Sequence, residues 1–286
     1  MDIGDLRRRL YFPPLGLCED DSNFMKYADC SSADFQAKTF VDICRQIDKE
    51  PIYHRKLWEW VFIVHHLRKK GMLIPNKTGL VFGVGTEPLP SFFASLGVNV
   101  VATDAPPDVI VDSGWTQSNQ YAESKKTLLN KNIIDEEKFD NLVSYRHCDM
   151  NNIDDSLKNF DFCWSSCCFE HLGSLQYGAD FVINSVEKTL KLGGVACHTT
   201  EFNLSSDNNT IEHGPTVIYR RRDIKELAFK LRQRGHDVEE VVFSNNQSAI
   251  DSFVDIPPFH DGFPHIKLQL EQYVVTSVGL VITRRR

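Results

Sequence analysis

Short apolar runs alternate with longer amphipathic segments along this chain, which is the pattern of strands interleaved with helices. Strands that alternate with helices imply a parallel sheet, and two strands in succession near the end imply an antiparallel edge. The pattern therefore predicts an α/β fold with a mostly parallel, seven-stranded sheet and an antiparallel edge strand. The predicted strands are residues 80–82, 98–103, 142–146, 160–165, 195–200, 238–243 and 272–283. The predicted helices are residues 33–47, 53–70, 88–96, 116–131, 179–190 and 222–234.

The first 75 residues carry helical patterns before the first predicted strand. Within residues 53–70, Leu57, Val61 and Val64 recur at three- and four-residue spacing, which is typical of an amphipathic helix. Basic residues followed by Gly71 mark the end of this helix. We predict an N-terminal helical extension over residues 1–75, packed on the edge of one large domain over residues 76–286.

Residues 79–104, with the sequence GLVFGVGTEPLPSFFASLGVNVVATD, combine a strand, a glycine turn, a helix and a second strand that ends in an acid. Gly83 and Gly85 let the backbone approach a ligand closely. Asp104 follows about 20 residues later, where a carboxylate accepts hydrogen bonds from ribose hydroxyls. This unit predicts a binding site for an adenosine-containing cofactor.

Glu87 and Pro88 stand where a dinucleotide-binding fingerprint has its third glycine. A pyrophosphate needs N–H donors at the helix N-terminus, whereas Glu87 is anionic and Pro88 has no N–H. The sequence therefore argues against a nicotinamide dinucleotide. An acid at this position suits a cofactor that carries positive charge and no phosphate, such as S-adenosylmethionine.

Composition narrows the class of partner and the compartment. The 286 residues include 32 Lys and Arg against 39 Asp and Glu, a formal net charge of −7, which disfavours nucleic acid. No run approaches the ~20 apolar residues of a membrane span, and residues 1–10 lack the apolar segment of a signal peptide. Eight cysteines without zinc-ligand spacing read as reduced thiols. We expect a cytoplasmic protein with no membrane span.

The order of these motifs resembles that of the class I S-adenosylmethionine-dependent methyltransferases. The resemblance spans roughly residues 78–284. It rests on the GVG turn, the acid that closes the second strand, Asp149 after the third, FDFCWSSCCFEH at the fourth and LKLGG before the fifth. It implies a Rossmann-like methyltransferase fold, S-adenosyl-L-methionine as cofactor and an enzyme that transfers its methyl group.

The resemblance also implies which residues hold the cofactor. The glycines would border its methionine part, Asp104 would hold the ribose, and Asp149 would accept from the adenine amino group with Met150 against the ring. The chain departs from the family at Val81, where an acid often contacts the ammonium group. Either Glu87 supplies that charge or the contact passes to backbone carbonyls. The implied cofactor residues are Gly83, Gly85, Glu87, Asp104, Asp149, Met150 and Ser166.

Histidine and acidic residues follow the fourth and fifth strands, at the sheet edge that faces the ligand. Methyl transfer to a hydroxyl needs a base, and histidine suits that task. The candidate catalytic residues are His171, His198 and Glu201, although a helix-capping role for the first and a core role for the second stay open. Glu170, His171 and Glu201 also offer metal ligands, but no adjacent pair of acids follows the fourth strand, so we expect no metal.

A narrower resemblance is to methyltransferases associated with surface polysaccharide biosynthesis, carried by KLWEW, WSSCCFEHLGSL and TVIYRRRDI. It implies O-methylation of a sugar hydroxyl on a glycan or a nucleotide sugar. Trp115 and Tyr121, separated by several amide side chains, offer an aromatic platform for such an acceptor. Two alternatives stay open: a methyltransferase for a small metabolite or a protein, and a non-catalytic module that only binds the cofactor.

Overall fold

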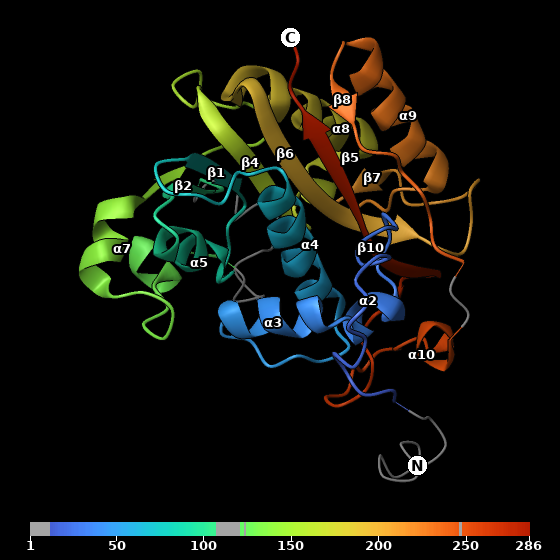
Figure 1. The fold of residues 1–286 in the computed structure, drawn as a ribbon. Coiled ribbons are helices and arrows are strands. Elements are labelled where there is room, and N and C mark those ends of the chain that lie inside the picture. Colours follow the sequence, from blue (N-terminus) through green and yellow to red (C-terminus); the bar gives the residue numbers. More distant parts are fainter. Residues whose placement is uncertain (1–11, 107–120, 123, 246–247) are drawn as a thin grey trace.

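The computed structural model describes residues 12–106, 121–122, 124–245 and 248–286, and its centre is one mixed sheet (Figure 1). The strands are β1 (Thr78–Phe82), β2 (Asn99–Asp104), β3 (Val143–His147), β4 (Phe160–Ser166), β6 (Leu190–Asn203), β8 (Asp237–Val238), β9 (Leu268–Leu270) and β10 (Tyr273–Thr283). Their order is β3-β2-β1-β4-β6-β10-β8, with β9 paired to β10. The first five strands in this order run parallel, and β10 runs antiparallel to its neighbours. The predicted Rossmann-like α/β fold with a mostly parallel sheet is confirmed, although the sheet of the described residues has eight strands and not the predicted seven.

Strand β10 differs from the prediction in its place in the sheet. It lies between β6 and β8 and is therefore not an edge strand. Its register with β6 runs without a break from Val275 opposite Asn203 to Thr283 opposite Val195. Almost every residue of β10 is buried, because helices cover both of its faces. A strand buried in this way needs hydrogen-bonded neighbours on both sides.

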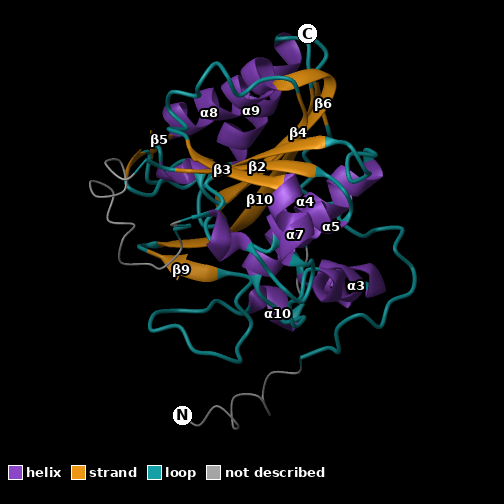
Figure 2. Cartoon of the chain, turned by 90° about the vertical axis from the view of Figure 1, so that its left-hand side faces the viewer, coloured by secondary structure: helices purple, strands orange, loops and turns teal. Residues whose placement is uncertain are grey.

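Helices form one layer on each face of the sheet (Figure 2). The first layer comprises α2 (Ser32–Gln36), α3 (Lys38–Gln46), α4 (Arg55–Lys69), α5 (Leu89–Ser95) and α7 (Glu136–Leu142). The second comprises α8 (Leu175–Asn184), η4 (Ser185–Thr189) and α9 (Arg221–Gln233). Successive strand residues point to opposite faces. Val81 and Trp164 accordingly belong to the core under the first layer, and Leu80 and Cys163 to the core under the second.

Helix α4 of the extension packs on the face of the sheet, against β4, β6 and β10, and not on the edge as predicted (Figure 1). The sequence pattern predicts one apolar stripe along this helix, which includes Leu57. In the structure, side chains outside this stripe are buried as well, among them Trp58 and Phe62. Gly279 in β10 admits the Phe62 ring, since a Cβ at this glycine would lie 2.3 Å from Phe62 Cζ. The missing side chain at position 279 thus lets α4 approach the sheet closely.

Gly279→Ala is expected to lower the free energy of unfolding by about 1–3 kcal/mol, because the new methyl group overpacks the α4–β10 contact. Chemical denaturation followed by circular dichroism measures this change. In a Phe62→Leu background, where the ring is absent, the same substitution should cost much less. Equal costs in the two backgrounds would show that Phe62 is not the obstacle.

Two other predicted segments differ from the structure. Six residues of the helix predicted over residues 116–131 lie outside the described residues, and in its described part only the 3-10 helix η2 (Lys125–Leu128) is helical. The strand predicted over residues 238–243 shortens to β8. The structure also adds α7, whose N-cap residue Asp135 accepts a hydrogen bond from the backbone N–H of Lys138.

Candidate functional site

The carboxyl ends of β1, β2 and β4 border a cavity of about 250 Å³. The strand order reverses between β1 and β4, which is where an open α/β sheet binds its ligand. The structure thus brings most of the predicted cofactor residues to one place, although their roles stay predictions. The predicted residues that line the cavity are Gly83, Gly85, Glu87, Asp104, Met150 and Ser166.

The glycine turn after β1 needs its glycines for conformation and for space. Gly83 and Gly85 have φ angles of 60° and 52°, in the left-handed region that favours glycine. A Cβ at Gly83 would also lie 2.9 Å from Cys168 Sγ. The turn therefore presents bare backbone to the cavity, as the sequence predicted.

Asp104 is held at the end of β2 by backbone donors. Its Oδ2 accepts from the N–H groups of Gly85 (3.0 Å) and Ala122 (3.2 Å), and its Oδ1 accepts from Ala105 (2.9 Å). Burial raises the pKa of Asp104, although these three bonds oppose the shift. The carboxylate is thus fixed in one orientation and joins the glycine turn to the segment around residue 122.

Glu87 lies on the same cavity wall and is 5% exposed. Its Oε1 accepts a hydrogen bond of 2.6 Å from Trp164 Nε1. Burial raises its pKa to about 8, so that the carboxyl group is mostly protonated at neutral pH until a positive charge approaches it. A buried carboxyl group in this state can lose its proton when a cationic ligand binds beside it.

Asp149 is the one predicted cofactor residue that the structure places outside the cavity lining. Its Oδ1 accepts from the backbone N–H of Asn151 at 2.8 Å, while the neighbouring Met150 side chain lines the cavity. The turn after β3 therefore offers Met150 to the cavity and leaves the carboxylate of Asp149 bonded within its own turn.

His171 ends the short helix η3 (Phe169–His171) and lines the cavity. Its Nδ1 lies 2.9 Å from the carbonyl oxygen of Pro215. A carbonyl only accepts, so Nδ1 carries the hydrogen and Nε2 is the basic nitrogen of the neutral ring. Burial, with the charges of Lys56 and Arg55, lowers the pKa of His171 to about 4. The ring is therefore neutral at pH 7 and able to accept a proton.

His198 lies in the core and not in the cavity lining, which counts against a role as base. It is fully buried in β6. Its Nδ1 lies 2.8 Å from Ser165 Oγ and its Nε2 lies 2.9 Å from Ser185 Oγ. Burial lowers its pKa to about 3. Both ring nitrogens are thus engaged by hydroxyls, and the structure supports the alternative of a core histidine.

Glu201, the third candidate catalytic residue, also lies outside the cavity lining. It is 5% exposed near the end of β6, and its Oε1 accepts from the guanidinium of Arg55. Its neighbours are Cys167 and Glu170, whose ligand atoms lie within 4.8 Å of it. Glu201 therefore belongs to a buried polar cluster beside the cavity.

Helix α4 contributes charged residues to the site that sequence reasoning missed. Glu59 is fully buried, and it accepts from Lys56 Nζ at 2.6 Å, Ser277 Oγ at 2.6 Å and Ser166 Oγ at 3.0 Å. Burial raises the pKa of Glu59, but the charges of Lys56 and Arg55 outweigh it and hold the pKa at about 2.

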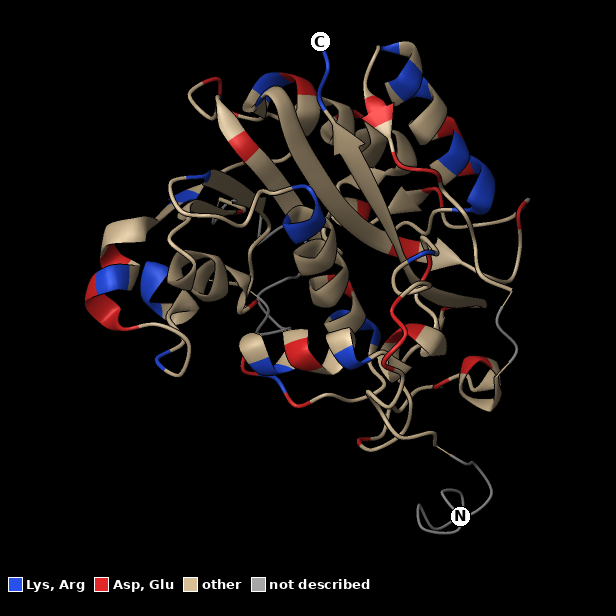
Figure 3. Ribbon diagram, viewed as in Figure 1, with Lys and Arg blue, Asp and Glu red and all other residues tan. Residues whose placement is uncertain are grey.

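One signal for this network was present in the sequence. Glu59 is the single acid in residues 53–70, and it follows the basic pair Arg55-Lys56 at helical spacing. Figure 3 shows these charges at one end of α4, apart from the basic residues at its other end. Lys56 and Trp60 line the cavity, so α4 supplies one of its walls.

The surface charge is mixed, with basic and acidic residues interspersed over most elements (Figure 3). Helix α9 carries the basic residues Arg221, Arg222, Lys225, Lys230 and Arg232 together with the acids Asp223 and Glu226. In the described part of the chain, no helix has both the length and the apolar character that crossing a membrane requires.

Comparisons with known proteins give only distant similarities. No family model and no curated protein matches the sequence. The structure of TehB from Haemophilus influenzae aligns with 87% of this chain and 67% of its own, at 15% identity and a TM-score of 0.45. A S-adenosylmethionine-dependent methyltransferase from Clostridium acetobutylicum aligns over 87% and 99%, at 11% identity and a TM-score of 0.43.

A third similar structure is 1,6-didemethyltoxoflavin-N1-methyltransferase from Burkholderia thailandensis, with bound S-adenosylhomocysteine. It aligns with 78% of this chain and 76% of its own, at 14% identity and a TM-score of 0.42. TM-scores below 0.5 at such low identity do not establish a common function. The function has to be argued from the cavity itself.

Proposed function

We propose that this chain is an S-adenosylmethionine-dependent O-methyltransferase that acts on a sugar hydroxyl of a glycan or a nucleotide sugar. The observation that carries the proposal is the position of Asp104, fixed at the end of β2 in one cavity with the glycine turn and Glu87. A glycine turn, a fixed acid at the end of β2 and a second acid at the helix start together suit a cofactor that contains a nucleoside but no pyrophosphate.

The residues present fit the cofactor at both of its polar ends. A carboxylate has about four lone-pair sites, and the three backbone bonds to Asp104 leave one for a ribose hydroxyl. Glu87, buried on the same wall, offers a carboxylate to the positively charged methionine end. Pro88 precedes the first residue of α5, so this helix start lacks one of the N–H donors that phosphate binding uses.

His171 is the residue that we propose accepts the proton of the acceptor. When bound, S-adenosylmethionine would supply the methyl group from its sulfonium and leave as S-adenosylhomocysteine, and the cavity walls would orient the acceptor hydroxyl. As that oxygen loses its proton, the neutral His171 ring takes it at Nε2. The Pro215 carbonyl fixes the ring orientation through Nδ1.

Aromatic and polar groups on the cavity wall support a sugar as the acceptor. Trp60 and Tyr121 line the cavity together with Lys56. The indole N–H of Trp60 is buried and has no hydrogen-bond partner among the described residues, so a ligand hydroxyl can supply one. Trp115, the other predicted platform residue, lies outside the described residues. Flat apolar rings beside donors suit sugar faces.

The cysteines support a reducing compartment, and we propose a cytoplasmic location. All eight lie in the described part of the chain and all are free thiols. Most are buried among apolar residues, where they pack as small hydrophobic side chains.

Calorimetry with S-adenosylmethionine and S-adenosylhomocysteine tests the cofactor, and transfer of a labelled methyl group to a panel of nucleotide sugars and glycans tests the acceptor. We expect both ligands to bind and label to enter a carbohydrate. Absence of binding would reject the cofactor assignment. Label entering only peptides or small metabolites would reject the sugar, and binding without any transfer would favour a non-catalytic module.

The affinity for S-adenosylmethionine is expected to rise between pH 6 and 7.5. Glu87 is protonated below its pKa of about 8, and a cationic ligand favours the carboxylate, so binding releases a proton. By linkage the affinity then increases with pH, by up to about tenfold per unit. Isothermal titration in buffers of different ionisation enthalpy measures the released proton. Glu87→Gln should bind with a flat pH profile; a variant that keeps the wild-type slope would show that another group titrates.

A further inference from the structure

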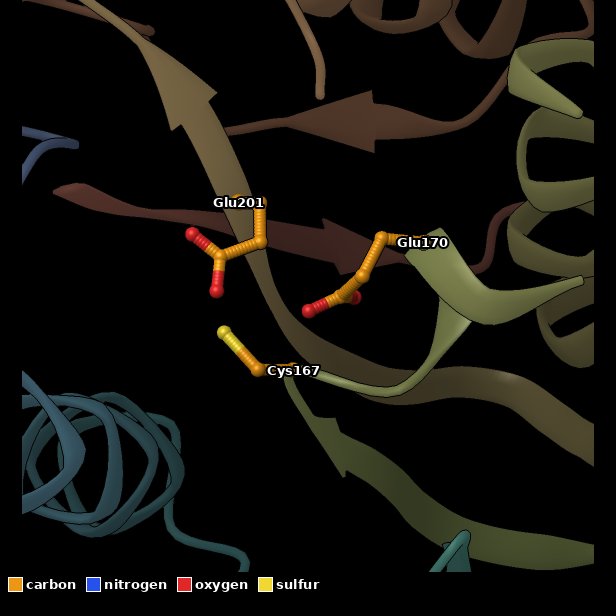
Figure 4. Close-up of side chains that lie close together, drawn as sticks. All are labelled: Cys167, Glu170 and Glu201. Atoms are coloured by element: carbon orange, nitrogen blue, oxygen red, sulfur yellow. The ribbon is translucent and has the colours of Figure 1, made fainter. Parts of the chain in front are cut away.

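Three potential metal ligands converge beside the cavity, namely Cys167, Glu170 and Glu201 (Figure 4). Cys167 follows β4, Glu170 lies in η3 and Glu201 lies in β6. The sulfur of the cysteine and one oxygen of each carboxylate all lie within 4.8 Å of one another. Figure 4 shows the thiol and the two carboxyl groups directed toward a common space.

One oxygen of each carboxyl group in this cluster makes no hydrogen bond within the described residues, although His171 Nε2 lies 3.9 Å from Glu170 Oε1. Glu170 Oε1 and Glu201 Oε2 are buried, and neither has a hydrogen-bond partner within the described ranges. The other oxygens are engaged, since Thr200 Oγ1 donates to Glu170 Oε2 at 3.0 Å and Arg55 donates to Glu201 Oε1. Buried polar atoms without partners are costly. Two such oxygens in one cluster point to a positively charged ligand between them.

The charged side chains beside the cluster are Arg55, Lys56 and Glu59, and the Cys167 thiol donates to Glu59 Oε1 at 3.1 Å. Arg55 and Lys56 lie within ion-pair distance of Glu59, so these three side chains together carry one positive charge. A divalent ion bound by a thiolate and two carboxylates carries one negative charge. The loaded cluster is therefore neutral as a whole, which limits the desolvation cost of burying it.

The set of donor atoms selects the kind of metal. Mg²⁺ and Ca²⁺ take about six or more ligands, nearly all of them oxygen, whereas a thiolate with two carboxylates suits four-coordinate zinc. Burial raises the pKa of the Cys167 thiol, and a bound metal reverses this effect by stabilising the thiolate. Because Cys167 also lines the cavity, an ion bound to it is accessible from there.

We propose that Cys167, Glu170 and Glu201 bind one divalent transition-metal ion, with zinc as the best fit. Binding of the ion stands independently of the methyltransferase activity. Its further role, as a Lewis acid that lowers the pKa of an acceptor hydroxyl, rests on the proposed function.

The test measures zinc and cobalt binding to the full chain after chelation and dialysis. We expect one ion per chain, and with Co²⁺ a thiolate-to-metal charge-transfer band. Cys167→Ser should abolish this band. Loss of a hydrogen-bond partner of a metal ligand weakens metal binding by about 10–100-fold. Glu170→Gln and Glu201→Gln each remove a ligand, so each should weaken zinc binding by more than this. Circular dichroism checks that each variant is folded.

Cys168→Ser is the matched control, because this neighbouring thiol donates to the Phe82 carbonyl and does not belong to the three ligand atoms that lie within 4.8 Å of one another. It should keep the band and the affinity. A wild-type chain that binds neither metal, or a folded Cys167→Ser variant that keeps the band, would overturn the site. Calorimetry with S-adenosylhomocysteine on the same samples separates this failure from failure of the proposed function.

Discussion

Replacing His171 by alanine is expected to lower kcat by about 10²–10⁴, the range that a general base contributes. The ring is neutral, and the Pro215 carbonyl accepts from Nδ1, which makes Nε2 the nitrogen that takes the proton. The affinity for the cofactor should stay close to that of the wild type, because the cofactor contacts that we propose come from the glycine turn, Asp104 and Glu87. Steady-state kinetics on the acceptor, with calorimetry for the cofactor, separates the two effects.

His171→Asn is the matched control for this experiment. Asparagine keeps an N–H donor for the Pro215 carbonyl but has no basic nitrogen, so it should preserve the local fold and lose turnover as alanine does. His260→Ala, in an exposed loop, should leave kcat unchanged. If both variants at position 171 keep wild-type turnover, the base is a different group.

Asp104→Ala is expected to weaken the binding of S-adenosylmethionine and S-adenosylhomocysteine by about 10–100-fold. Hydrogen bonds to a charged group contribute about 1.5–3 kcal/mol. The substitution also releases the N–H groups of Gly85 and Ala122, so the wall loses its alignment as well as an acceptor. Isothermal titration gives the affinities, and thermal unfolding shows whether the variant stays folded.

Two nearby acids provide the comparison for Asp104→Ala. Asp149→Ala should have a much smaller effect, because the structure keeps that carboxylate outside the cavity lining and bonded to Asn151. Asp154→Ala, at a surface ion pair with Arg146, should have none. If Asp149→Ala weakened cofactor binding as much as Asp104→Ala, the result would support the adenine contact that the resemblance implies for Asp149.

The glycine turn and Asp104 could be predicted from the sequence because the whole unit lies within 26 consecutive residues, 79–104. Strand, turn and helix are local patterns, and the chain between the glycines and the acid is too short to place them elsewhere. Met150 and Ser166, which only the resemblance implied as cofactor residues, lie outside this unit and also line the cavity.

What the sequence could not show depends on contacts between distant segments. The sequence assigned His198 to the fifth predicted strand, but it could not show that Ser165 and Ser185 would occupy both sides of its ring. The place of β10 inside the sheet likewise depends on long-range pairing with β6. Glu59 lies more than 100 residues from the serine that it contacts in β4, so only its unusual place in an amphipathic helix hinted at a role.

The close fit of α4 against Gly279 has a consequence for how this protein could diverge. The same helix packs Phe62 into the hydrophobic core and supplies Lys56, six residues earlier, to the cavity wall. A substitution that shifts the helix to relieve crowding at β10 would also displace the charged residues at its other end. Substitutions that alter the packing of this helix would therefore also alter the cavity wall. We expect the residues at its contact with β10 to change more slowly in evolution than other residues that are equally buried.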